Sequence, residues 1–145
     1  MTATTPRANG QTIGLAHYAS RALLENVLAR TGTTFNQSVA LRAVSDNGGT
    51  VERGWLVDRL TGALKIDESA ADGTVTEMTD AKLLEPVGGQ VALTESGREL
   101  FEGVRAGGNE IAARLYAGIP AEDLATAGRV LTLITERADA ELAAL

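Results

Sequence analysis

The fold is decided by residues 58–93, which read DRLTGALKIDESAADGTVTEMTDAKLLEPVGGQVAL. Asp58 and Asp67 are residues of the kind that caps a helix N-terminus, and they precede predicted helices over residues 59–64 and 68–82. Only Lys65-Ile66 is left between the first helix and the second cap, so the connection is a tight turn. Two helices joined in this way form a helix-turn-helix.

The end of the same stretch predicts a β-hairpin. Residues 83–87 and 90–93 are short apolar runs, and Gly88-Gly89 between them suits the positive φ angles of a two-residue turn. Pro86 has no N–H to donate, so its strand is expected at an edge of the sheet. A hairpin directly after a helix-turn-helix makes a winged helix.

The second helix of the pair has a competing interpretation. Gly73 in its middle costs about 1 kcal/mol relative to alanine. The β-branched triplet Thr74-Val75-Thr76 would also suit a strand. Packing against neighbouring elements would have to hold this segment helical.

Helical periodicity continues on both sides of the winged helix. Apolar residues recur every three or four positions over residues 13–30. Thr34 and Gln37 have the spacing of a capping box, which predicts the start of a second helix. The other predicted elements are a brief strand at Trp55-Leu56-Val57 and long helices over residues 95–117 and 121–145. The predicted fold class is mainly α: a winged helix-turn-helix with a small β-hairpin wing and long terminal helices.

The amino-acid composition excludes several kinds of catalytic and metal-binding site. The chain has 145 residues, which suits one domain, with no cysteine and one histidine. Disulfides, a thiol nucleophile and cysteine-ligated metals are therefore excluded, and no motif supplies a nucleophile with a base. We predict no enzyme activity, no metal site and no cofactor.

Charge and hydropathy bear on partners and location. The net charge is −6, and residues 55–93 alone carry −4, which argues against a strongly basic nucleic-acid binder. No stretch is apolar over the ~20 residues that a membrane span requires. Residues 1–11 are polar and do not form a secretory signal, so we expect a cytoplasmic protein without a membrane partner.

Four segments carry a family resemblance. Residues 34–44 resemble the second helix of the MarR (multiple-antibiotic-resistance regulator) family, and residues 55–67 resemble its strand, third helix and turn. Residues 91–101 are the most specific match, because they contain the family's L-T-x-x-G motif, and residues 119–124 resemble the entry to its last helix. The resemblance implies one domain over residues 1–145, with dimerisation helices in residues 12–32 and 94–145 around a winged helix over residues 33–93. It also implies a homodimeric transcription regulator of double-stranded DNA, often released by a small phenolic or aromatic ligand.

The sequence departs from that family where DNA is usually read. Family members place Arg, Ser or Thr on the reading helix, with an Arg where this chain has Gly73, and a longer wing with its own Arg. Here the reading helix offers Glu68, Asp72 and Glu77, and no cation lies between Lys82 and Arg98. DNA affinity depends on phosphate neutralisation by Lys and Arg, so these carboxylates oppose tight binding.

The resemblance assigns candidate sites by position. The candidate DNA-binding residues lie on the reading helix and in the wing: Glu68, Ser69, Ala70, Asp72, Gly73, Thr76 and Gln90. The candidate ligand-binding residues, which would lie in a cleft below the dimerisation helices, are His17, Tyr18, Arg21 and Trp55. For His17 and Trp55, ordinary packing is the competing interpretation.

Two functions follow. The first is a homodimeric, DNA-binding transcription regulator of MarR type. The second is a binding module of the same fold that has weak or lost DNA recognition and binds a small molecule or a partner protein. The acidic reading helix and the short wing favour the second, and the overall pattern favours the first.

Overall fold

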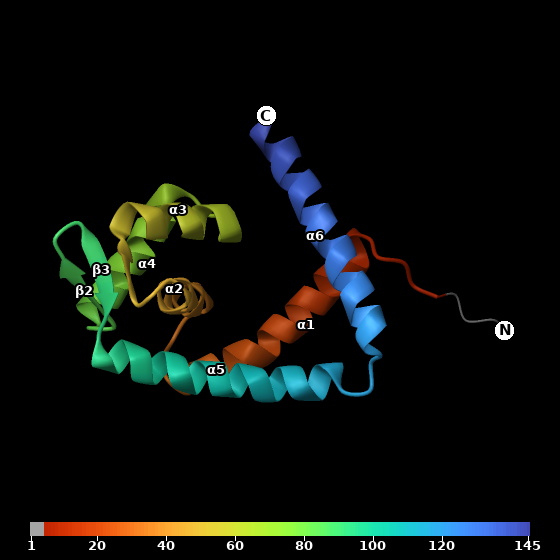
Figure 1. The fold of residues 1–145 in the computed structure, drawn as a ribbon, viewed down its shortest axis with the longest axis horizontal. Coiled ribbons are helices and arrows are strands. Elements are labelled where there is room, and N and C mark those ends of the chain that lie inside the picture. Colours follow the sequence, from red (N-terminus) through yellow and green to blue (C-terminus); the bar gives the residue numbers. More distant parts are fainter. Residues whose placement is uncertain (1–4) are drawn as a thin grey trace. The chain divides into compact units, whose positions relative to one another are not determined.

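A computed structural model describes residues 5–145 of the chain. Over that range the elements are, in order, α1 (Gly10–Ala29), α2 (Phe35–Asp46), β1 (Thr50–Glu52), α3 (Arg53–Leu64), α4 (Glu68–Asp80), β2 (Leu84–Val87), β3 (Gln90–Leu93), α5 (Glu95–Tyr116) and α6 (Ala121–Ala143) (Figure 1). The chain forms two compact units, one reaching to Ile111 and one from Ala112 to Leu145. The mainly helical, winged-helix fold class is confirmed.

Capping boxes begin the first two helices, and the one predicted at Thr34 is confirmed. Thr34 Oγ1 accepts from the Gln37 N–H at 3.1 Å, and the Gln37 side chain accepts from the Thr34 N–H at 3.2 Å. Asn9 and Thr12 form a second capping box, so α1 begins at Gly10, three residues before the predicted start. Each box satisfies two backbone N–H groups that would otherwise lack a partner.

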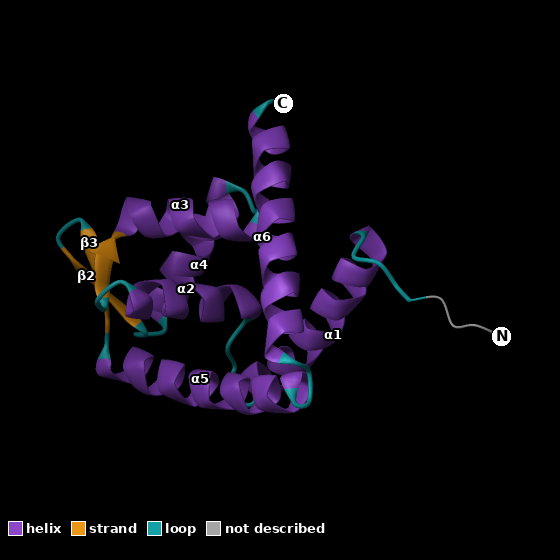
Figure 2. Ribbon diagram, turned by 45° about the vertical axis from the view of Figure 1, so that its right-hand side comes forward, coloured by secondary structure: helices purple, strands orange, loops and turns teal. Residues whose placement is uncertain are grey.

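Three antiparallel strands form one sheet in the order β1–β3–β2 (Figure 2). The two residues of the turn between β2 and β3 are Gly88 and Gly89, and Gly88 has a φ of +63°. Gly89 does not have a positive φ, so one of the two glycines is needed for the turn. Pro86 lies on β2 at the edge of the sheet, as predicted.

The strand predicted at Trp55-Leu56-Val57 is wrong. The strand is β1 at Thr50–Glu52, which pairs with β3, and Trp55 lies in the first turn of α3. Leu56, Val57 and Leu60 are all buried, and this spacing suits the inner face of a helix rather than a strand. The helix predicted over residues 59–64 therefore begins six residues earlier, without a side-chain cap.

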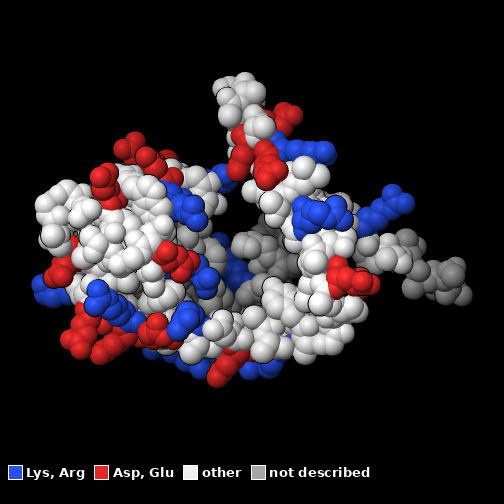
Figure 3. Space-filling view, in the orientation of Figure 1, with Lys and Arg blue, Asp and Glu red and all other residues white. Residues whose placement is uncertain are grey.

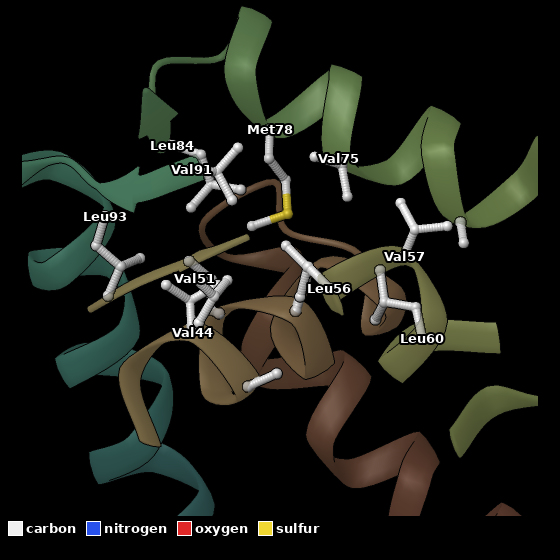
Figure 4. Packing of buried hydrophobic residues seen from close by; sticks show 14 of the residues in the cluster. Val44, Val51, Leu56, Val57, Leu60, Val75, Met78, Leu84, Val91 and Leu93 are labelled. Atoms are coloured by element: carbon white, nitrogen blue, oxygen red, sulfur yellow. The ribbon is translucent and has the colours of Figure 1, made fainter. Parts of the chain in front are cut away.

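The core packs α2, α3 and α4 against the sheet (Figure 4). Ala71, Val75 and Met78 of α4 are fully buried at helical spacing, and Met78 lies with Leu56 of α3 in the same cluster. This packing answers the doubt over α4: the buried face outweighs the cost of Gly73. Burial of each large apolar side chain contributes about 1.5–3 kcal/mol, against about 1 kcal/mol for the glycine.

The start of α5 is hydrogen-bonded to the segment between α4 and β2. Thr94 Oγ1 donates to the carbonyl of Lys82 at 2.6 Å and accepts from the N–H of Gly97 at 3.0 Å. The N–H of Thr94 donates to the carbonyl of Leu83 at 3.1 Å. A Cβ on Gly97 would overlap that same Leu83 carbonyl oxygen. The L-T-x-x-G motif thus builds a backbone-to-backbone contact, and Phe101 one turn later lies in the core cluster.

The second unit contains α6, and no residue of this helix is buried. Its larger apolar side chains are between 37% and 52% exposed: Leu124, Leu131, Leu133, Ile134 and Leu142. Apart from Leu133, they recur at positions that lie on one side of a helix. The helix therefore carries an apolar stripe whose side chains are at least one-third exposed.

Candidate nucleic-acid interface and cavity

The predicted DNA-binding residues share the outward face of α4. Its inner face is made by Ala71, Thr74, Val75 and Met78, which are buried. The outward residues are exposed except for half-buried Gly73: Glu68, Ser69, Ala70, Asp72 and Thr76. A Cβ on Gly73 would meet nothing within 4 Å, so this position is open to solvent.

The electrostatics of this face depend on a residue outside α4. The helix has four acids and no lysine or arginine. Arg53, the first residue of α3, reaches across to it: Arg53 Nη2 lies 2.8 Å from Asp72 Oδ1 and donates to Thr76 Oγ1 at 3.2 Å. The expectation of an uncompensated carboxylate at Asp72 is therefore corrected, because the carboxylate is paired across 19 residues of sequence.

The wing is joined to the backbone of the same residue, Arg53, at the start of α3. The N–H of Arg53 donates to the carbonyl of Gly89 at 3.1 Å, so the hairpin turn is tied to the start of α3. Gln90 follows directly and is exposed at the start of β3. The outward face of α4, the side chain of Arg53 and the hairpin turn are thus linked by hydrogen bonds. On the face drawn in Figure 3, acidic and basic side chains of the winged helix are interspersed and form no continuous blue stripe.

A cavity of about 330 Å³ lies between α1 and the start of α2. Its lining residues are Arg21, Glu25, Ala29, Thr33, Thr34, Phe35 and Asn36. The guanidinium of Arg21 lies 4.1 Å from the centre of the Phe35 ring, and its Nε lies 3.2 Å from Glu25 Oε1. The cavity thus combines the Arg21–Glu25 ion pair, one aromatic face and several hydroxyl or amide groups. Arg21 attracts an anionic aromatic ligand, and Glu25 opposes it.

The predicted ligand residues are only partly brought together. Arg21 lines the cavity, and the ring of His17 stands edge-on to Phe35 with centroids 6.4 Å apart. Tyr18 is 69% exposed and contacts His17 rather than the cavity. Trp55 lies on α3, is 38% exposed and is not among the lining residues.

Phe35, Thr33 and Asn36 line the cavity but were not identified from the sequence. The signal was present in part, because Thr34 was identified as the cap that starts α2, and the cavity opens beside that cap. Nothing in the sequence pairs Arg21 with Phe35, because the two residues lie 14 positions apart.

Within residues 5–145, no three His, Asp or Glu side chains come together as a metal ion would require. None of the described helices combines the length and the apolar character needed to cross a bilayer.

The fold is shared with several solved structures. Ligand-free NadR is 19% identical, with a TM-score of 0.77 over 92% of this chain and 98% of NadR. CouR from Rhodococcus jostii RHA1, bound to p-coumaroyl-CoA, is 20% identical, with a TM-score of 0.74 over 87% of this chain and 90% of CouR. The Mycobacterium tuberculosis MarR family protein Rv2887, in complex with DNA, is 21% identical, with a TM-score of 0.67 over 89% of this chain and 98% of Rv2887.

The likeness is one of structure. No protein-family model and no curated protein sequence matches the chain. At this level of identity the solved structures show the fold, which is the MarR-type winged helix.

Proposed function

Because the chain has the winged-helix fold of the MarR-type regulators, we propose that it is a homodimeric transcription regulator that binds double-stranded DNA through α4 and the wing. The observation that carries this proposal is the face formed by Ser69, Asp72 and Thr76 with Arg53, which is exposed and hydrogen-bonded to the wing through Arg53. As a regulator of this kind, it would act in the cytoplasm and catalyse no reaction.

The charge of the winged helix sets the expected strength of binding. Residues 33–93 carry five cations and nine acids. Each phosphate contact contributes about 0.9 to the slope of log affinity against log salt concentration. We therefore expect modest affinity and a shallow salt dependence, in contrast to a strongly basic repressor.

Gly73→Arg tests whether α4 faces DNA. The substitution places a cation on the open side of the helix, and we expect affinity for random-sequence duplex to rise about tenfold in 0.1 M salt. Gly73→Ala is the matched control, because it adds a Cβ and no charge. Both variants should gain up to about 1 kcal/mol of stability from the loss of a helical glycine.

The measurement is a duplex titration at fixed salt, paired with a thermal melt. If both variants melt higher and neither binds DNA more tightly than the original chain, α4 faces something other than DNA. That result would favour the second function, a binding module of the same fold. The acidic outward face of α4 is the observation that supports this alternative.

A small aromatic anion is the proposed effector, and the cavity beside Arg21 is its proposed site. NadR has been solved in complex with 4-hydroxyphenylacetate and Rv2887 in complex with salicylic acid. Both ligands carry a carboxylate and an aromatic ring. In this chain the Arg21 guanidinium would pair with the carboxylate and Phe35 would contact the ring, while the nearby hydroxyl groups accept or donate hydrogen bonds.

Arg21→Met is expected to weaken binding of salicylate or 4-hydroxyphenylacetate by about tenfold or more, because a charge-assisted hydrogen bond contributes about 1.5–3 kcal/mol. Methionine keeps the apolar stem over Phe35 and removes the charge. Arg42→Met, which makes the same charge change on the exposed side of α2, should leave ligand affinity unchanged. Calorimetric titration measures both, and equal losses in the two variants would argue against this cavity.

The homodimer would be formed by the apolar stripe of α6 together with α1 and α5. The support is that α6 has no buried residue and yet carries Leu131 and Ile134 on its apolar side. Homo-oligomers of this kind are usually two-fold symmetric, so the same stripe would pack against its copy.

A further inference from the structure

We propose that Arg53 donates to a guanine in the major groove, replacing the cation that α4 lacks, and that Asp72 positions its guanidinium for that contact. This inference rests on the proposed DNA-binding function and names the residue that would give it sequence preference. It concerns an arginine that the sequence places outside α4, at the start of α3.

Arg53 is held at both ends. Its backbone N–H is fixed by the carbonyl of Gly89 in the hairpin turn, at 3.1 Å. Its Nη2 is fixed by Asp72 Oδ1 at 2.8 Å and Thr76 Oγ1 at 3.2 Å on α4. A long side chain usually loses entropy when it is ordered by a ligand. Here that ordering is already done in the free protein.

The position of the guanidinium suits a reading residue. Asp72 and Thr76 are one helical turn apart on the outward face of α4, and the guanidinium bonds to both of them. Gly73 lies beside the pair with open space above it, so no side chain of α4 covers this part of the face. Arg53 is therefore the cation that reaches the middle of a helix that has no Lys or Arg of its own.

Hydrogen-bonding capacity remains after these contacts. All three contacts that Arg53 makes with α4 use Nη2. Within residues 5–145, Nη1 and Nε have no hydrogen-bond partner. Arginine offers five N–H donors in a planar fork, so donors remain for O6 and N7 of guanine. The Arg53 side chain is 37% exposed, which leaves it accessible from the groove side.

The carboxylate of Asp72 then has opposite effects on the affinity for DNA and on the discrimination between sequences. Its charge repels phosphate and lowers affinity for every sequence. Its hydrogen bond holds the guanidinium in one orientation, which raises discrimination between base pairs. Removing the carboxylate should therefore increase binding to random duplex and reduce sequence preference together, and a purely structural role would not produce that combination.

The experiment is in vitro selection of duplexes from a random pool by the full chain, followed by affinity measurements on the selected site and its single-base variants. We expect the selected site to contain a guanine whose replacement costs about tenfold in affinity. With Arg53→Lys, which keeps the charge, that one preference should be lost while the others remain. With Asp72→Ala the same preference should weaken while random-duplex affinity rises, and Asp72→Asn, which keeps an acceptor, should retain most of the preference.

A second ion pair of the same length supplies the controls. Arg105 Nη2 lies 2.8 Å from Glu102 Oε2 on α5, with both side chains more than half exposed. The hydrogen bond and charge of Glu102 raise the pKa of Arg105, so the charge of this arginine is stabilised by its partner. Arg105→Lys and Glu102→Gln should change neither the selected sequence nor the random-duplex affinity. Thermal melts of all variants check that each is folded.

The outcomes separate this inference from the proposed function. If the original chain enriches no sequence and binds no duplex, both are overturned. If it enriches a site and Arg53→Lys keeps every base preference, the function stands and the role of Arg53 is overturned. A uniform loss of affinity for all sequences with Arg53→Lys would mean a phosphate contact and would equally overturn the base-reading role.

Discussion

Replacing Gly97 with alanine is expected to lower the melting temperature by about 3–9 °C. The added Cβ would overlap the carbonyl oxygen of Leu83 and lie 3.1 Å from its carbonyl carbon, and backbone atoms cannot move aside as a flexible side chain can. Over-packing of this kind costs about 1–3 kcal/mol. Each kcal/mol shifts the midpoint by about 3 °C in a chain of this size. The hydrogen bond from Thr94 to the same carbonyl would weaken as the helix is displaced.

Gly103→Ala is the matched control on the same helix. A Cβ at Gly103 would meet nothing within 4 Å, so only the helix propensity changes. This variant should be stabilised by up to about 1 kcal/mol. Thermal melts followed by circular dichroism compare the two. If Gly97→Ala melts with or above Gly103→Ala, α5 does not approach the Leu83 carbonyl as closely as described.

Leu131→Glu is expected to separate the proposed dimer into monomers at micromolar concentration. The two-fold arrangement would bury one such leucine from each subunit, and each contributes about 1.5–3 kcal/mol. Loss of both would weaken association at least about 100-fold. Glutamate also places a charge in the apolar stripe, which has no cation to pair with it at that position. Sedimentation velocity over a concentration series measures the change.

The control for this variant is two residues away. Leu133 has the same exposed fraction as Leu131, 42%, but successive residues turn by about 100°, so the two side chains point to opposite sides of α6. Leu133→Glu should leave the dimer intact. A monomeric original chain would contradict the dimer itself, and equal dissociation of both variants would contradict the choice of face.

Local signals in the sequence were reliable where the physical cause is local, except at Asp58, which was expected to cap a helix and lies inside α3. The capping box of Thr34 and Gln37, the cap at Asp67 and the glycine turn before β3 each act within a few residues, and each is present. The strand predicted at Trp55-Leu56-Val57 failed for the opposite reason. A short apolar run suits a strand and a helix equally, and pairing with β3, about 40 residues further on, decided that Thr50–Glu52 is the strand.

The candidate interface also combines features set by local sequence with features set by long-range contacts. The resemblance placed Ser69, Asp72 and Thr76 on the reading helix, and the structure shows that all three are exposed. The ion pair that neutralises Asp72 joins residues 19 positions apart, and no periodicity connects them. The L-T-x-x-G motif contains Gly97, but the motif does not show why a glycine is required there. The reason is the carbonyl oxygen of Leu83, which three-dimensional packing places against this position.

The strand order β1–β3–β2 has a consequence for synthesis on the ribosome. The last strand to be made takes the centre of the sheet, so β1 has no neighbour until residues 90–93 have left the ribosome. The hydrogen bonds of Thr94 and the burial of Phe101 form later still. The inner faces of α2, α3 and α4 therefore remain partly exposed until the first turns of α5 have been synthesised. A fragment that stops at Leu93 would leave these apolar faces partly exposed. The shortest segment able to complete the winged helix extends through Phe101.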